Sequence, residues 1–106
     1  MARRLLTDFE IMILLAILRI GEEAYGVPIA REIETTTGRT VQLPSIYAAL
    51  GRLEGQGLVQ SRLGESTAQR GGRAKKYFSL TPAGLGSVRD TRKAMTALWA
   101  RLPQLT

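Results

Sequence analysis

The side chains that could carry out chemistry in this chain are those of arginine, lysine, aspartate and glutamate. The sequence of 106 residues holds 15 Lys and Arg, 9 Asp and Glu, and neither histidine nor cysteine. Disulfides and thiolate metal sites are therefore excluded, and the commonest general base is missing. Glu22 and Glu23 lie in a predicted turn, and Glu32 and Glu34 are two apart and do not share a helix face. We expect no enzyme, no catalytic residue, no metal site and no cofactor.

One glycine-containing stretch, AQRGGRAKK at residues 68–76, has three interpretations: a phosphate-binding loop, a disordered basic tag, or a flexible finger that binds an anion. The first fails because no G-x-x-x-x-G-K-[ST] pattern is present and a strand follows the glycines. The second fails because predicted strands flank the stretch on both sides. The sequence therefore favours a projecting basic finger.

Positive charge is concentrated in one third of the chain. Residues 60–93 hold eight Lys and Arg against two acids, whereas residues 1–59 hold six against seven. This asymmetry suggests an anionic partner, nucleic acid before membrane. The alternative is a solvated basic surface without a partner.

No feature of the sequence points to a membrane. The longest apolar run, Ile11–Leu18, has 8 residues, whereas a membrane-spanning helix needs about 20. No basic-then-apolar leader with a small-residue cleavage site is visible. We expect a single-domain cytoplasmic protein.

Capping signals and apolar spacing predict three helices in the first half of the chain. Residues 7–20 open with a T-x-x-E capping box, Thr7 and Glu10, and are apolar on nearly all sides. A second helix is expected at about 27–36, with Pro28 in its first turn. A third is expected at about 44–56, with an apolar face of Ile46, Leu50 and Leu53. Its opposite face carries small residues and one cation: Ser45, Ala48, Ala49 and Arg52.

The second half predicts a β-hairpin and a last helix. Residues 58–63 and 75–80 read as strands around a polar, basic loop at 64–74. Thr81 is the expected N-cap of the last helix. Pro82 follows at the first helical position, and Pro103 lies just past the end of the helix. Apolar residues along this helix form a heptad seam that only Arg92 interrupts.

This order of elements predicts a mainly α fold with a small β-hairpin. The expected architecture is a winged helix-turn-helix with a C-terminal dimerisation helix. Residues 1–80 would form the winged-helix DNA-binding part, and residues 81–106 the dimerisation helix of the same compact unit.

Two motifs make the chain similar to the PadR-like transcriptional regulators. PSIYAALGRLEGQGLV (44–59) contains the family's Y-x-x-L-x-R-L-E-x-x-G-L-V pattern, and GGRAKKYFSLTPAG (71–84) leads into L-T-x-x-G. The Tyr25–Gly26 pair matches as well. The resemblance spans about residues 5–102 and implies a homodimer that binds two-fold symmetric double-stranded DNA and usually represses. Some members are released by small aromatic effectors. This chain ends after one C-terminal helix and therefore resembles the short form.

The residues expected to touch DNA come from the third helix and the wing. A helix enters the major groove when its outward face is slim, as Ala48 and Ala49 make it here. The recognition candidates are Gln42, Ser45, Tyr47, Ala48 and Arg52. Each has a structural alternative: a solvated loop residue for Gln42, a cap for Ser45, half-buried packing for Tyr47 and a surface ion pair for Arg52. The wing candidates for phosphate contact are Arg70, Arg73, Lys75 and Lys76, and their alternative is a mobile loop whose charges only raise solubility.

The last helix supplies the candidates for dimerisation and for an effector site: Leu85, Val88, Met95, Leu98, Trp99 and Leu102. Two Trp99 side chains that meet across a two-fold axis would bound a flat slot for a planar aromatic molecule. The alternative is a tryptophan that only packs the helix pair. The competing function for the whole chain is a winged-helix protein-interaction module with a basic wing and no operator specificity.

Overall fold

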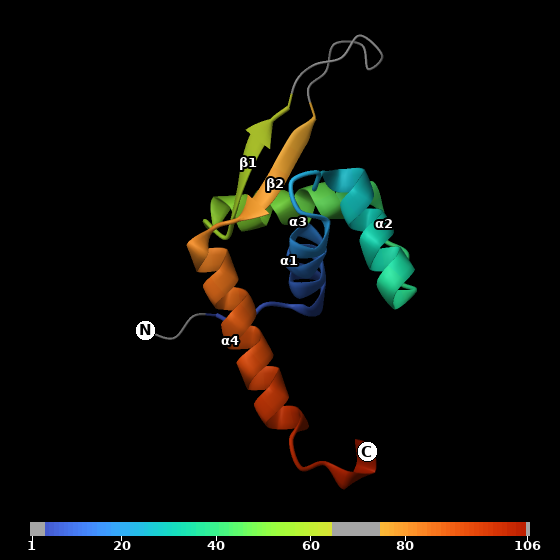
Figure 1. Cartoon of the computed structure of the whole chain (residues 1–106), viewed down its shortest axis with the longest axis vertical. Coiled ribbons are helices and arrows are strands. Elements are labelled where there is room, and N and C mark those ends of the chain that lie inside the picture. Colours follow the sequence, from blue (N-terminus) through green and yellow to red (C-terminus); the bar gives the residue numbers. More distant parts are fainter. Residues whose placement is uncertain (1–3, 65–74, 106) are drawn as a thin grey trace.

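Three helices lead into a two-stranded hairpin and a final long helix in the computed structural model, which describes residues 4–64 and 75–105 (Figure 1). The elements are α1 (Asp8–Ile20), α2 (Gly26–Thr37), α3 (Leu43–Gly55), β1 (Val59–Leu63), β2 (Lys76–Leu80), α4 (Pro82–Trp99) and a short 3-10 helix, Pro103–Leu105. The two strands pair antiparallel, with Val59 opposite Leu80 and Leu63 opposite Lys76. The predicted mainly α fold with a small hairpin is confirmed. No helix in the described ranges is long and apolar enough to cross a membrane.

The predicted helix signals are present at the start of α1. The Thr7 hydroxyl accepts a hydrogen bond from the Glu10 backbone N–H at 3.2 Å, and the Glu10 carboxylate accepts one from the Thr7 N–H at 2.8 Å. This capping box satisfies two N–H groups that the helix itself leaves unpaired. The helix ends at Gly21, whose positive φ of 86° favours glycine.

One apolar core lies where all the elements meet. Ile13 and Leu14 from α1 and Ile29 from α2 are fully buried, as are Ile46 and Leu53 from α3. The hairpin adds Val59 and Phe78, and α4 adds Val88. The core therefore fixes α3 and the base of the wing relative to each other.

The start of α4 is pinned to the turn between α3 and β1. The Thr81 hydroxyl donates a hydrogen bond to the Gly57 carbonyl at 2.6 Å, and the Thr81 N–H donates to the Leu58 carbonyl at 3.1 Å. Gly84 lies directly on the same turn: a Cβ there would be 3.0 Å from the Leu58 carbonyl carbon and closer still to its oxygen. The glycine of the L-T-x-x-G motif is therefore required by a close approach between two backbones.

Helix α4 changes character along its length. Its first half packs on the body of the chain through Gly84, Ser87, Val88 and Thr91, and the buried Thr91 hydroxyl accepts a hydrogen bond from the Leu6 N–H at 3.1 Å. The second half projects away from that body (Figure 1). Helix α4 ends at Trp99, three residues before the predicted seam ends, because Arg101 adopts a positive φ of 60° and Pro103 disfavours a helical Leu102.

The Arg4 guanidinium holds the pKa of the Glu10 carboxyl at about 2, well below its usual range, and the Thr7 N–H adds to the effect. Arg4 donates hydrogen bonds of 2.8 and 3.0 Å to the two carboxylate oxygens, and Glu10 is 7% exposed. Arg4 also donates to the Gln56 side chain at 2.7 Å. The interaction thus joins the N-terminal segment, α1 and the end of α3.

We predict that Glu10→Gln lowers the free energy of unfolding by about 2 kcal/mol at pH 7, a value reduced from the full pKa shift because Arg4 is half exposed to water. The folded pKa of Glu10 lies below the ordinary value of 4.5 for a glutamate side chain. The carboxylate therefore stabilises the fold fully above that value, and its contribution declines as pH falls toward the folded pKa. Urea unfolding of both proteins between pH 7 and pH 3 checks this, since the difference must shrink with acidity. Glu34→Gln, at an exposed acid of α2, should shift stability by less than about 0.5 kcal/mol at any pH.

Candidate nucleic-acid interface

The outward face of α3 is narrow and polar. Ser45, Ala48 and Arg52 are all exposed and lie at spacings of three and four residues, so they form one strip along the helix. Gln42 precedes this strip at the N-cap position, where its exposed side chain makes no capping hydrogen bond. The structure thus brings four of the predicted recognition residues to one surface.

The placement of Ala49 on this outward face was wrong. Ala49 is completely buried and belongs to the core with Ile46, Leu50 and Leu53. It follows Ile46 by three residues, which puts it beside the apolar face of the helix. The slimness of the outward strip therefore depends on Ala48 and on Gly51, where an added Cβ would have no atom within 4 Å apart from its chain neighbours and the backbone of its own helix.

Tyr47 lies at the border of this strip and packs against the start of α2. The residue is 48% exposed. A Cβ at position 26 would lie 2.8 Å from the Tyr47 Cε1 and closer to its hydroxyl, so Gly26 leaves the space that the ring occupies. Half-buried packing, the structural alternative for Tyr47, is thus present, while about half of the residue's surface still faces solvent.

Arg52 has no acidic partner among the residues that the structure describes. The nearby Glu54 is engaged elsewhere: its carboxylate accepts a hydrogen bond from the Ser61 hydroxyl and lies 3.3 Å from the Lys76 Nζ. The hydrogen bond from the Ser61 hydroxyl lowers the pKa of the Glu54 carboxyl, and Lys76 lowers it further by a smaller amount. Arg52 therefore keeps its positive charge uncompensated at the surface of α3.

The wing candidates divide into two groups. Arg70 and Arg73 lie outside the described residues. Lys75 and Lys76 lie at the base of the wing, where each contacts its own chain: the Lys75 Nζ is 4.0 Å from the centroid of the Tyr25 ring, and the half-exposed Lys76 pairs with Glu54. These two lysines hold positive charge at the junction of the wing and the helices.

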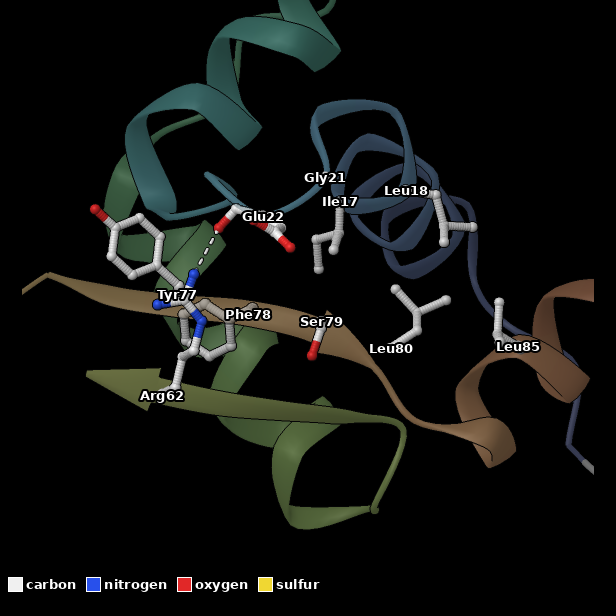
Figure 2. Close-up of a pocket in the computed structure, with 10 residues that line it drawn as sticks. All are labelled: Ile17, Leu18, Gly21, Glu22, Arg62, Tyr77, Phe78, Ser79, Leu80 and Leu85. Carbon is white, nitrogen blue, oxygen red and sulfur yellow. Dashed lines mark hydrogen bonds between the residues drawn. The ribbon is translucent and has the colours of Figure 1, made fainter. Parts of the chain in front are cut away.

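Sequence reasoning missed a cluster that joins the wing to the turn between α1 and α2. The guanidinium of Arg62 lies 4.7 Å from the centroid of the Tyr77 ring and donates a hydrogen bond of 3.1 Å to the Glu22 carbonyl (Figure 2). The Tyr77 ring meets the Tyr25 ring edge to face at 5.7 Å. Arg62 and Tyr77 are direct cross-strand partners. Strand alternation could have placed these two on one face, but nothing in the sequence pairs them with Glu22.

The candidates on α4 fall into two environments. Leu85 borders a hollow beside the wing, and Val88 belongs to the core of its own chain. Met95, Leu98, Trp99 and Leu102 are exposed, with Leu98 at 69% and Trp99 at 64%. Met95 and Leu98 continue along α4 the face that Gly84, Val88 and Thr91 bury nearer the start, Trp99 borders this face, and Leu102 lies just past the end of the helix. No group of three or more potential metal ligands occurs in residues 4–64 and 75–105.

Comparisons with known proteins agree on the kind of protein. The model of the transcriptional regulator PadR-like family matches residues 14–90. A search of curated proteins finds no significant relative.

Solved structures share the fold over nearly the whole chain. A PadR-like transcriptional regulator from Bacillus cereus is 25% identical, with 92% of this chain and 89% of the other covered and a TM-score of 0.72. A PadR family transcription regulator from Clostridium difficile is 22% identical, with 92% and 98% covered and a TM-score of 0.70. A transcriptional regulator from Clostridium thermocellum is 23% identical, with 89% and 91% covered and a TM-score of 0.69. Since the family match covers most of the chain, including α3 and the wing, this protein belongs to the PadR-like family of transcriptional regulators.

Proposed function

We propose that this protein is a cytoplasmic, homodimeric repressor that binds a two-fold symmetric DNA operator. The observation that carries the proposal is the exposed strip of α3, in which Ser45, Ala48 and the unpaired Arg52 lie in line. A strip of this kind fits the major groove, which is about 12 Å wide. Gln42 and Ser45 would read base edges, and Arg52 would contact phosphate.

The wing would bind the DNA backbone beside the groove. Lys75 and Lys76 hold charge at its base, and the sequence places Arg70 and Arg73 in the loop between the strands. Cationic side chains at the backbone supply affinity rather than sequence reading. Specificity would therefore come from the strip of α3.

The second half of α4 would hold two copies together. We define the apolar stripe as Met95, Leu98 and Trp99 of α4 together with Leu102 just past its end, all of which are exposed. Leu15 on α1 is also exposed, at 42%. Burying the stripe and Leu15 against a second copy would remove apolar area from water. A two-fold dimer then sets the half-sites about one helical turn apart.

A dimer of this kind would also bring two Trp99 side chains near its axis. Their exposed rings could stack on a planar aromatic molecule, and such an effector would release the operator by changing how the two halves are held. The stripe thus accounts for both dimerisation and an aromatic effector in this proposal.

We expect Leu98→Lys to convert the dimer into monomers at micromolar concentration, because it places a charge in the centre of the buried stripe. The matched control is Ala97→Lys, since Ala97 is the exposed neighbour that faces away from the stripe. Sedimentation equilibrium of both variants measures the result. Equal dimer stability in the two variants would exclude the stripe as the interface.

Selection of bound sequences from a random DNA pool tests the proposed function as a whole. We expect a two-fold symmetric consensus, and release from it when an aromatic ligand is added. Binding to bulk DNA with no consensus would reject an operator-specific regulator. Binding that also ignores substitutions at Gln42 and Tyr47 would favour the protein-interaction module instead.

A further inference from the structure

A hollow of about 600 Å³ lies beside the wing, outside both the α3 strip and the apolar stripe of α4. Figure 2 shows it between the end of α1, the turn that follows α1, strand β2 and the start of α4. Its volume is in the range of about 300–1,000 Å³ that small-molecule sites occupy.

One part of the hollow is apolar. Ile17 and Phe78 are 3% and 5% exposed and line its inner side. Leu18, Leu80 and Leu85 border the remainder, and Leu18 is 47% exposed. A ligand that covers these three leucines would remove apolar surface from water.

The other end of the hollow carries one positive and one negative charge. The Arg62 guanidinium is held flat by the Tyr77 ring and by its hydrogen bond to the Glu22 carbonyl, and no carboxylate in the described ranges pairs with it. The exposed side chain of Glu22 likewise has no cationic partner among these residues. Both residues line the hollow, and the hydrogen bond from Arg62 to the Glu22 carbonyl, dashed in Figure 2, makes them neighbours at this end.

We infer that this hollow binds a free α-amino acid with a large apolar side chain. An α-amino acid carries its carboxylate and its ammonium group on a single carbon, which matches a cation and an anion at one end of the hollow. Arg62 would bind the carboxylate through its planar donor fork, and Glu22 would accept hydrogen bonds from the ammonium group. The apolar side chain would then lie on Leu18, Leu80 and Leu85.

A ligand in this position would act on the wing. Arg62 and Tyr77 are wing residues, and the hydrogen bond from Arg62 to Glu22 is one of the links between the wing and the helices. Another is the bond from the Phe78 N–H to the Ala24 carbonyl, at 2.8 Å. A carboxylate that draws Arg62 away from Glu22 changes how the wing is held. This consequence for DNA affinity rests on the proposed function, whereas the binding itself does not.

Titration calorimetry of the whole chain without DNA tests the site, with L-phenylalanine and L-leucine as probes. 3-Phenylpropionate lacks the ammonium group and 2-phenylethylamine lacks the carboxylate, and each should bind at least about tenfold more weakly than L-phenylalanine. Equal affinity for 3-phenylpropionate and L-phenylalanine would overturn the assignment, and so would no binding of either amino acid.

Two variants assign the charges. Arg62→Gln should weaken the binding of L-phenylalanine about tenfold and leave the affinity for 2-phenylethylamine unchanged. Glu22→Gln should also weaken the binding of L-phenylalanine about tenfold, but leave the affinity for 3-phenylpropionate unchanged. Glu23→Gln is the matched control, because this exposed neighbour does not line the hollow, and it should leave binding unchanged. Urea unfolding verifies that each variant is folded.

Amide chemical shifts in NMR spectra locate the ligand. Shifts at Gly21, Ser79 and Leu85 support the hollow, and shifts confined to Leu98 and Trp99 would move the ligand to the α4 stripe and overturn the inference. The proposed function is tested independently of this site. If the chain binds L-phenylalanine but selects no DNA sequence, the amino-acid site is supported and the operator-specific function is rejected.

Discussion

Replacing Ala48 by glutamate is expected to weaken operator binding by at least about a hundredfold. The side chain at this position lies between Ser45 and Arg52 on the exposed strip of α3. Glutamate there adds bulk where the helix must approach the base edges, and it adds a negative charge close to phosphates. Like charges brought together at an interface cost several kcal/mol, and about 2.7 kcal/mol already corresponds to a hundredfold loss. A mobility-shift titration with the selected operator measures the effect.

The control for this prediction carries the same change of charge. Ala83 is exposed in the first turn of α4, where an acidic residue is favoured by the helix dipole. We expect Ala83→Glu to change operator affinity by less than about threefold, since long-range charge effects are screened at physiological salt. If both variants lose affinity equally, the loss reflects net charge and the strip of α3 is not the reading surface.

Gly84→Ala is the substitution expected to have the largest effect on stability. The added Cβ would lie 3.0 Å from the Leu58 carbonyl carbon and nearer to its oxygen, and backbone cannot move aside as a flexible side chain does. Overpacking of this kind costs about 1–3 kcal/mol, and contact with backbone favours the upper end. The Thr81 hydrogen bonds that join α4 to Gly57 and Leu58 would be strained as well. Urea unfolding followed by circular dichroism measures the loss.

Gly51→Ala provides the comparison. Gly51 also lies inside a helix, α3, but an added Cβ there would have no atom within 4 Å apart from its chain neighbours and the backbone of its own helix. Alanine should therefore stabilise the fold by about 0.5–1 kcal/mol through its higher helix propensity. Both variants are measured at the same protein concentration, because the proposed dimerisation would make stability depend on it. A Gly84→Ala protein as stable as the parent would show that α4 can move away from the turn.

Local signals predicted the elements well. The capping box at Thr7, the Thr81 cap and glycines after helices α1 and α2 each act within one turn of chain, so their meaning is independent of the rest of the fold. The three helices before the hairpin and both strands lie within one residue of their predicted bounds. The end of α4 was less well predicted, because a heptad pattern continues through Leu102 while the backbone at Arg101 does not.

The candidate site was predicted only in outline. The spacing of Ser45, Ala48 and Arg52 predicted that they share one strip, and in the structure all three lie on the exposed face of α3. Spacing failed at Ala49, which is buried, because the width of the buried face depends on how closely α1 and the hairpin pack on α3. The division of α4 into a buried first half and an exposed stripe likewise depends on where the rest of the body ends.

The sequence by itself determined the order of the helices and strands, their caps, the concentration of positive charge and the family. These follow from the period of apolar residues and from motifs that act over a few positions. Only the tertiary structure decided that Gly84 meets the Leu58 carbonyl, that Tyr47 packs on Gly26, and that Arg62 and Glu22 share one end of a hollow. Such contacts join residues that are 21 to 40 positions apart, and the packing of the core, rather than local spacing, sets their distances.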